Sequence, residues 1–314
     1  MPDYDPRLTA RRAARQAQLR RRRLTAAGML ILIVVAAAAA IAAASGGSGT
    51  ASHTSSKLGA GATPPPQRAP SHSNPLTSED AKGVRNIRRL ARLGLPVYCA
   101  GPRGNAVAFT FDDGPGPYTH YAVKKLRQSG ERATFFVVGR SMNNFPGWLP
   151  RELPLAAIGD HTYTHPLLTY LSPDAVMSEI SRTKAKIEHD SGQPVTLFRP
   201  PYGARNATVD HVAQSLGLLD IIWTVDSADS LGANWAGIIQ NVERGLHPGA
   251  IILMHENRGQ TIRALTTLLP ELHRRHLRSV SLPELFATDP PSVAQLRRGP
   301  TGCGVGGRVP SGGG

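Results

Sequence analysis

Three short stretches of this sequence carry the side chains that metal-assisted hydrolysis needs. Two histidines four residues apart, His161 and His165, can bring imidazole nitrogens to one cation from a helical turn or from a tight loop of similar pitch. An aspartate pair, Asp112 and Asp113, lies upstream, and an apolar run ending at His255 lies downstream. Two imidazoles and one carboxylate leave a coordination position open for water, which is typical of catalytic metal sites. The second aspartate and His255 could then act as base and acid.

Each stretch also has a purely structural interpretation. The aspartate pair precedes a Gly-Pro turn, where such side chains often bond to the backbone, and the two histidines could be ordinary polar loop residues. Arg199, in the rigid turn 198–203, could hold a carboxylate by a bidentate contact or form a surface salt bridge. In the same turn, the backbone N–H of Tyr202 could face a developing oxyanion.

The chemically interesting residues fall just after strand-like runs that alternate with helix-like runs. The strand-like runs are 105–111, 133–138, 195–198, 219–224 and 250–254. The helix-like runs are 79–94, 119–129, 172–191, 207–216, 235–246 and 261–276. This alternation predicts a parallel sheet with crossover helices. Because Asp112, Arg199, Asp226 and His255 all follow strands, and strand ends converge on one face of an α/β barrel, we expect a barrel rather than an open sheet.

In this order the motifs resemble those of the polysaccharide deacetylases, carbohydrate esterase family four, also called the NodB-homology domain. The motifs are TFDDGP at 110–115, HTYTH at 161–165, RPPYG at 199–203, WTVDSAD at 223–229 and LMH at 253–255. The resemblance covers approximately residues 104–286. It implies a distorted (β/α) barrel that removes N- or O-acetyl groups from sugar polymers with a divalent metal, usually zinc.

The resemblance also implies a role for each matched position. Asp112 is expected to be the general base, oriented by Arg199, and the Tyr202 N–H to help bind the oxyanion. His255 is expected to be the general acid, with Asp229 favouring its charged form and so raising its pKa. The implied ligands of the metal, Zn²⁺ or another divalent cation such as Co²⁺, are Asp113, His161 and His165. The residues implied to contact the substrate are Pro201, Trp223 and Leu253.

Two positions depart from the family pattern. Ser230 stands where the family often has a tryptophan, which could move the sugar-binding wall to Trp235. The same departure leaves open whether Asp226 or Asp229 supports the general acid. The segment 158–160 before the histidine pair is shorter than the usual glycine-histidine approach, so we expect a shortened loop there.

The N-terminal segment predicts export from the cytoplasm. Residues 1–25 carry eight arginines, and the 19 residues 26–44 carry no charge. A helix of that length spans roughly 28 Å, close to the ~30 Å hydrocarbon core of a membrane. The positive-inside rule then predicts a single-pass protein in the cell membrane with a cytoplasmic N-terminus and an extracellular catalytic domain. The alternative is a cleaved secretory signal, which would release the domain.

The remaining boundaries follow from composition. The Gly/Ser/Pro-rich residues 45–78 predict a flexible linker, and 79–103 a lead-in helix. The predicted catalytic domain is 104–288, and the Gly/Pro-rich residues 289–314 predict a loose tail. Cys99 and Cys303 lie on either side of the motifs, so in an oxidising exterior they can close one disulfide, the alternative being two free thiols.

Net charge narrows the class of partner. The chain carries +14, of which residues 1–25 contribute +6 and the exported part the remaining +8. Anionic membrane headgroups or wall polymers suit this charge better than nucleic acid, because no basic stripe interleaved with aromatics occurs and 5% of the residues are aromatic. We therefore expect an acetylated glycan and a membrane as partners and no nucleic acid, while the oligomeric state stays open.

Topology and motifs together predict a membrane-anchored, metal-dependent deacetylase of N-acetylglucosamine or N-acetylmuramic acid units in the cell wall. One alternative keeps the chemistry and changes the substrate to chitin oligomers or acetylxylan. Another alternative is a module that grips wall glycan without turning it over. The sequence pattern does not separate the polymers from one another.

Overall fold

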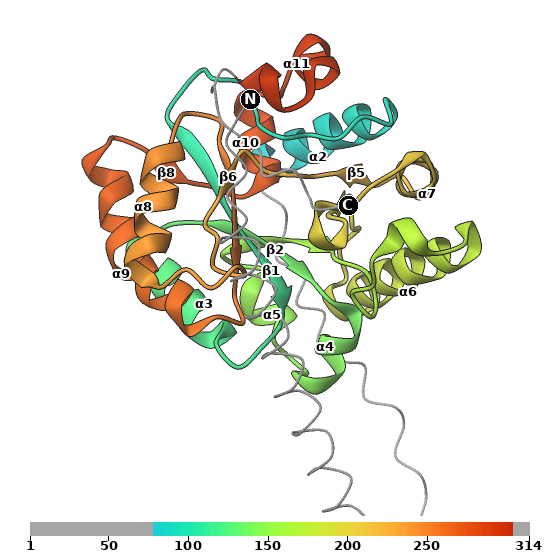
Figure 1. Ribbon diagram of the computed structural model, residues 1–314, viewed down its shortest axis with the longest axis horizontal. Helices are drawn as coiled ribbons and strands as arrows, with labels where there is room; N and C mark the ends of the chain where they lie inside the picture. The colour runs from blue at the N-terminus through green and yellow to red at the C-terminus, as the bar shows by residue number, and fades with distance from the viewer. Residues whose placement is uncertain (1–77, 304–314) are drawn as a thin grey trace, which may run out of the picture. The chain divides into compact units, whose positions relative to one another are not determined.

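Eight parallel strands form the centre of the chain in the computed structural model, which describes residues 78–303 (Figure 1). The strands are β1 Ala106–Gly114, β2 Ala133–Val137, β3 Ala156–Asp160, β4 Leu197–Phe198, β5 Leu219–Asp220, β6 Val225–Asp226, β7 Ile251–His255 and β8 Arg278–Ser279. Their order is β5-β4-β3-β2-β1-β7-β6, and β8 pairs with the start of β1. The predicted cytoplasmic segment 1–25, the anchor 26–44 and all but the last residue of the linker 45–78 lie outside the described residues.

The two strands at the ends of this order, β5 and β6, are consecutive in the sequence and are separated by residues 221–224. So short a connection keeps the two edges near each other, and the sheet is curled as a distorted barrel is, which confirms the predicted fold class. The predicted strand 219–224 was wrong in its extent. Residues 221–224 belong to no strand: Ile221 forms a single bridge with Val97, and the carbonyls of Ile221 and Ile222 accept hydrogen bonds from the side chain of Arg199.

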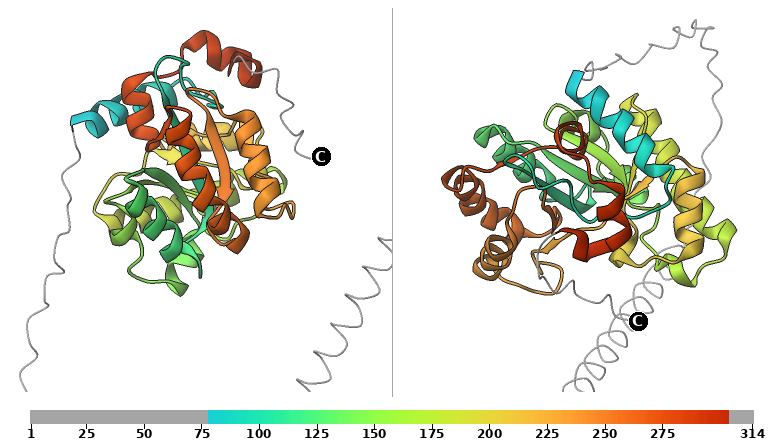
Figure 2. Two further views of the ribbon diagram at one scale, coloured as in Figure 1. Left: turned by 90° about the vertical axis from the view of Figure 1, so that its left-hand side faces the viewer. Right: turned by 90° about the horizontal axis from the view of Figure 1, so that it is seen from above.

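Helices pack against both faces of the sheet. They are α2 Ser78–Ala91, α3 Thr119–Ser129, α4 Gly139–Asn144, α5 Leu149–Glu152, α6 Pro173–Ser191, α7 Ala207–Ser215, α8 Trp235–Gly245, α9 Gly259–Arg274, α10 Leu282–Thr288 and α11 Val293–Arg298. Short 3₁₀ turns occur at η1 Leu168–Tyr170, η2 Pro201–Gly203 and η3 Gly299–Cys303. Figures 1 and 2 show α3, α8 and α9 grouped on one side of the sheet and α6 and α7 on the other. Among the described residues, no helix is both long and apolar enough to cross a membrane.

Both faces of the central strand are buried, and its alternation decides which side chains reach the site. Val107, Phe109 and Phe111 belong to one hydrophobic cluster, whereas Ala106 and Ala108 belong to a second cluster on the opposite face. Because side chains alternate between the two faces of a strand, those at positions 110 and 112 lie on the same face as Ala106 and Ala108. The strand therefore turns the first aspartate of the pair toward the interior of the curled sheet at its carboxyl end.

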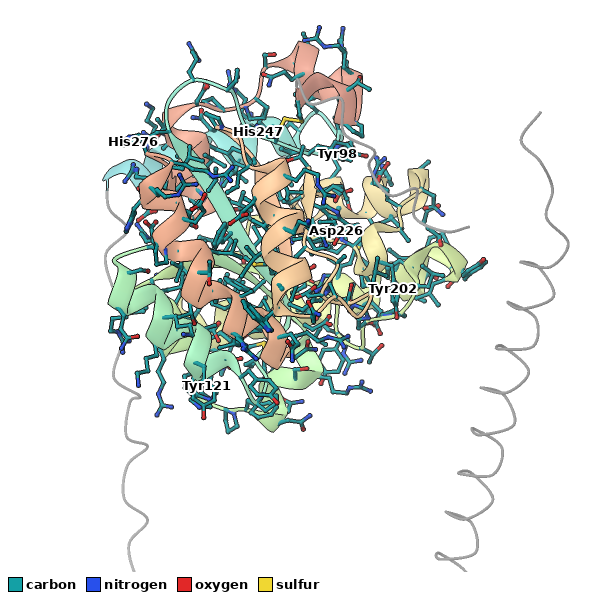
Figure 3. All side chains as sticks on the ribbon, turned by 60° about the vertical axis from the view of Figure 1, so that its left-hand side comes forward. Tyr98, Tyr121, Tyr202, Asp226, His247 and His276 are labelled. Carbon is teal, nitrogen blue, oxygen red and sulfur yellow. A yellow bond between two sulfur atoms is a disulfide. The ribbon has the colours of Figure 1, made fainter. Side chains whose placement is uncertain are left out.

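Several elements were absent from the sequence-based expectations. Strand β3 offers one bulky apolar side chain in Ala-Ala-Ile-Gly-Asp, so its pattern was too weak to detect. The segment predicted as a tail contains α11, which begins at a capping box made by Ser292 and Gln295. Its last described residue, Cys303, is joined to Cys99 by a disulfide with a Cα–Cα distance of 5.9 Å, as the sequence predicted. Figure 3 shows this disulfide beside Tyr98.

Candidate active site

Strand register brings the expected base and the expected acid to neighbouring positions. Asp112 on β1 pairs directly with His255 on β7, and both strands end within two residues of this pair. Because the strands are parallel, their carboxyl ends lie at the same edge of the sheet. His161 follows β3 and Arg199 follows β4 at that same edge. The sheet thus collects side chains from four strands, which agrees with the sequence-based expectation.

The three expected metal ligands lie together. The Oδ1 of Asp113 is 3.7 Å from His161 Nε2 and 3.2 Å from His165 Nε2. One ligand atom from each residue lies within 4.8 Å of the other two. Ligand atoms around a tetrahedral zinc ion, with bonds of about 2.1 Å, are separated by roughly 3.4 Å. The donor set and its spacing therefore fit a divalent metal such as zinc with an open position.

Left-handed backbone conformations aim these ligands. Asp113, Thr162 and His165 have φ angles of 71°, 65° and 62°, which place the histidine pair in a tight loop rather than in a helical turn. The Nδ1–H of His161 donates to the backbone carbonyl of Arg199 at 2.7 Å. This hydrogen bond leaves Nε2 without a proton and turned toward Asp113, as ligation requires.

Arg199 is fully buried and holds the carboxylate of Asp112, the expected base, in place. Its Nη1 donates to Asp112 Oδ1 at 2.8 Å and to Thr110 Oγ1 at 2.8 Å, and its remaining bonds reach the carbonyls of residues 221 and 222. Its guanidinium also lies 4.2 Å from the ring centroid of Phe136. The salt-bridge partner is thus the buried carboxylate of Asp112, and the surface-bridge alternative is wrong. The Asp112 Oδ2 atom is left on the metal side, 3.7 Å from His161 Nε2.

Burial and charge set the protonation of these groups. Burial raises the pKa of Asp112, and the nearby Arg199 and His255 charges oppose this rise. Burial, reinforced by the charge of His165, lowers the pKa of His161 to about 3. His161 is therefore neutral over the ordinary pH range, which is the form that binds a metal.

The expected general acid is held by one of the two aspartates left open by the sequence. His255 Nδ1 lies 2.7 Å from Asp229 Oδ1, and the His255 backbone N–H donates to Asp229 Oδ2 at 2.8 Å. Asp226 instead accepts from the backbone N–H of Ala228 at 2.7 Å. The geometry assigns the supporting role to Asp229. Burial alone lowers the pKa of His255, but the hydrogen bond and charge of Asp229 outweigh burial and raise this pKa to about 9.

The remaining predicted residues lie around this centre. Tyr202, which is labelled in Figure 3, has a φ of 62° and is 62% exposed. Its ring and that of His165 are in edge contact, with centroids 4.8 Å apart. Leu253 precedes His255 by two residues and so shares its face of β7. Trp223 packs over Gly203, where an added Cβ would lie 2.8 Å from the indole ring. Pro201 is buried in the same turn.

Three polar partners in the site went unnoticed in the sequence because their neighbours carried the motifs. Thr110 bonds to Arg199, as described above. Asn257 Nδ2 donates to Asp113 Oδ2 at 3.2 Å, on the oxygen away from the histidines. Glu256 is buried and accepts a short hydrogen bond from Thr119, whose hydroxyl also accepts the Gly116 N–H. The sequence did offer a signal for each residue: Thr110 lies within the TFDDGP motif, and Glu256 and Asn257 directly follow His255.

Comparison with known proteins decides the family. The family model described as polysaccharide deacetylase matches residues 100–220. A peptidoglycan-N-acetylglucosamine deacetylase from Bacillus cereus is 33% identical over 196 residues, which are 60% of this chain and 71% of that protein. The chain belongs to the polysaccharide deacetylase family.

Other members of the polysaccharide deacetylase family are similar over the same region. The Listeria monocytogenes peptidoglycan-N-acetylglucosamine deacetylase PgdA is 36% identical over 182 residues, covering 57% of this chain and 38% of that protein. The chain thus spans well under half the length of this relative. A solved family 4 carbohydrate esterase from Streptomyces lividans, in complex with acetate, is 38% identical with a TM-score of 0.54, covering 56% of this chain and 92% of that chain.

Proposed function

We propose that this chain is a metal-dependent deacetylase that hydrolyses the N-acetyl groups of cell-wall amino sugars. The observation that carries the proposal is the placement of two pre-oriented groups beside the ligand cluster. Asp112, held by Arg199, and His255, held by Asp229, are paired in register on neighbouring strands. A protein that only binds glycan has no evident need for a base, an acid and ligands together.

Amide hydrolysis needs a nucleophilic water, a stabilised oxyanion and a proton for the leaving amine. A divalent cation bound by Asp113, His161 and His165 would polarise the acetyl carbonyl and lower the pKa of a water molecule. As the oxygen of the attacking water bonds to the carbonyl carbon, Asp112 accepts one proton from that water. The backbone N–H of Tyr202 is the proposed donor to the oxyanion.

The step that breaks the carbon–nitrogen bond belongs to His255. Its Nδ1–H is engaged by Asp229, so Nε2 carries the proton that can be given to the amine nitrogen. The products are acetate and a free amino sugar. Leu253, Pro201 and Trp223 are the proposed contacts to the acetyl group and the sugar.

We propose peptidoglycan N-acetylglucosamine or N-acetylmuramic acid as the substrate and zinc as the metal. The family relative from Bacillus cereus, whose name states peptidoglycan-N-acetylglucosamine, supports the choice of peptidoglycan as substrate. The proposed location is the outer face of the cell membrane, with residues 26–44 as anchor or as a cleaved signal, and this rests on the sequence alone. Chitin-oligomer deacetylation and acetylxylan esterase activity are the competing activities.

The test is to incubate the purified full chain with zinc and each of three polymers: peptidoglycan, chitin oligomers and acetylated xylan. Acetate and free amines are then measured. We expect release from peptidoglycan to be fastest and to require the metal. Faster release from another polymer would change the substrate, and no release from any polymer, with retention on peptidoglycan unaffected by Asp112→Asn, would favour a binding module.

A further inference from the structure

A row of aromatic side chains runs over α3 and the turn before α5. Ring centroids are 6.5 Å apart between Tyr118 and Tyr121, 3.7 Å between Tyr121 and His120, and 6.0 Å between His120 and Trp148. Tyr118 and Tyr121 are 39% and 48% exposed, so the row is not part of the core. We call these four residues the aromatic row. Figure 3 shows Tyr121 at the end of the domain away from the disulfide.

The aromatic row begins next to the candidate active site. Tyr118 lies five residues after the ligand Asp113. Its hydroxyl would lie 3.5 Å from a Cβ added at Gly259, which follows the loop after His255. The row therefore starts between the loop that carries a ligand and the loop that carries the acid. At its other end, Trp148 lines an open groove of about 450 Å³ that α6 also borders.

The surroundings of the aromatic row are basic. Residues 114–152 contain six lysines and arginines and two acids, Glu131 and Glu152, both of which are buried. Among the basic residues, Lys124, Arg140 and Arg151 are exposed, and the guanidinium of Arg151 lies 4.8 Å from the centroid of Trp148. The groove beside Trp148 is locally balanced, because its Lys186 and Asp190 form an ion pair of 3.1 Å.

We propose that the aromatic row binds the glycan strand beyond the sugar that is deacetylated, and that this strand carries carboxylates. The proposal rests on the proposed function, since the occupant is the same wall-type substrate. Pyranose rings present apolar C–H faces that can stack on aromatic rings, while hydroxyl groups suit tyrosine and carboxylates suit the exposed basic residues. Exposed leucine or phenylalanine, which a lipid-binding surface would need, does not occur in residues 114–152.

Substrate length separates this proposal from a structural role. The full chain and its Tyr121→Ala and Trp148→Ala variants are assayed on long peptidoglycan strands and on a short acetylated oligosaccharide that fills only the catalytic centre. We expect KM for the long strand to rise about fivefold, as loss of one stacking contact implies. The kcat values and KM for the short substrate should not change. Tyr170→Ala removes a tyrosine that is 79% exposed and lies outside the row, so it is the matched control.

Two further measurements keep the proposal falsifiable. Tyr121 is more exposed than Trp148, so its variant retains the fold, and a thermal melt of each variant verifies this. Binding to insoluble peptidoglycan is measured by sedimentation in the Asp112→Asn background, so that the surface is tested even if no polymer is deacetylated. An equal change of KM for both substrate lengths, or none, would overturn the proposal. The proposal would also be overturned if the Tyr121→Ala and Trp148→Ala variants bound anionic phospholipid vesicles more weakly than the unsubstituted chain but bound peptidoglycan equally well.

Discussion

At the scale of single residues, Arg199 links the proposed base, Asp112, to the candidate ligand cluster. Its backbone carbonyl accepts the Nδ1–H of His161, while its side chain holds Asp112. Its complete burial means that this charge is compensated by one carboxylate and by neutral oxygen acceptors. Burial raises the pKa of Asp112, and the charge of Arg199 opposes this rise while its Nη1 holds the carboxylate in one orientation.

The pairing of His255 with Asp229 predicts a pH effect. With the pKa of His255 raised to about 9, the acid is protonated at neutral pH and is lost as pH rises through that value. Asp229→Asn removes the negative charge, so the pKa of His255 falls and the alkaline limb of kcat/KM moves to lower pH. Asp226→Asn, whose side chain bonds to Ala228 instead, should move this limb less. A larger shift from Asp226→Asn in the measured pH profiles would contradict the assignment.

The raised pKa of His255 also determines how the stability of the folded chain depends on pH. Because the folded-state pKa lies above the ordinary value of about 6.5, the His255–Asp229 pair contributes its full stabilisation below that pH and loses it as pH rises toward 9.

Asn257 predicts an effect on metal affinity. Its amide fixes the Asp113 oxygen that faces away from the histidines, and such supporting contacts commonly change metal affinity by about 10- to 100-fold. Asn257→Leu should weaken zinc binding in that range, measured by competition with a chromogenic chelator. Asn144→Leu, an exposed amide at the end of α4, is the control and should leave zinc affinity unchanged. Equal affinity in both variants would show that Asp113 needs no such support.

At the scale of elements, β1 and β7 are joined beyond their ladder by residues just after the acid. The Glu256 N–H donates to the carbonyl of Asp112, and its side chain holds Thr119 at the start of α3. Gly114 lies directly against this side chain, since an added Cβ would be 1.4 Å from Glu256 Oε1. The turn that carries the aspartate pair is therefore clamped between two elements.

Because Gly114 lies so close to Glu256, adding even one methyl group at Gly114 should destabilise the folded protein. Gly114→Ala should lower the free energy of unfolding by about 1–3 kcal/mol, because the buried carboxyl of Glu256 must move. Gly237→Ala, in α8, adds a methyl group 3.5 Å from its nearest neighbour and should be neutral or stabilising by up to about 1 kcal/mol. Chemical unfolding of both variants measures the difference. Equal free energies of unfolding for the two variants would show that Glu256 does not pack tightly against Gly114.

The sequence predicted most helices and the long strands because their apolar periodicity is strong, as in β1, α6 and α9. It also predicted which residues come together as candidate ligands and as the proposed acid–base pair, because those residues lie in the recognised motifs. It missed β3 and the break at 221–224, where short runs take their conformation from the strands and side chains that surround them. It also left the choice between Asp226 and Asp229 open, since only the three-dimensional turn brings one of them to His255.

At the scale of the whole molecule, the disulfide and the site lie at opposite ends of the sheet. Cys99 forms an isolated β-bridge with Ala250, the residue just before β7, whereas His255 is at the end of that strand. The bond joins residues 204 positions apart and fastens η3 to the segment before β1. It thus restrains the ends of the domain without touching the ligands.

Loss of this bond should change stability more than activity. Reduction, or the pair Cys99→Ser and Cys303→Ser, should lower the free energy of unfolding by about 2–4 kcal/mol through the added freedom of the unfolded chain. The rate of acetate release at 25 °C should be unchanged. Thermal melts and initial rates on the same preparations check both statements. A loss of activity in a fully folded reduced protein would contradict the separation of the two ends.

The central claim, that the ligand cluster and the flanking acid–base pair together hydrolyse acetamido groups, is tested most directly by zinc titration. The full chain is stripped of metal by a chelator, and acetate release from peptidoglycan is measured as zinc is added back. We predict that activity rises to a plateau at one zinc per chain, that His165→Ala loses both binding and activity, and that Asp112→Asn binds zinc but stays inactive. Full activity without bound metal, or in Asp112→Asn, would contradict the claim.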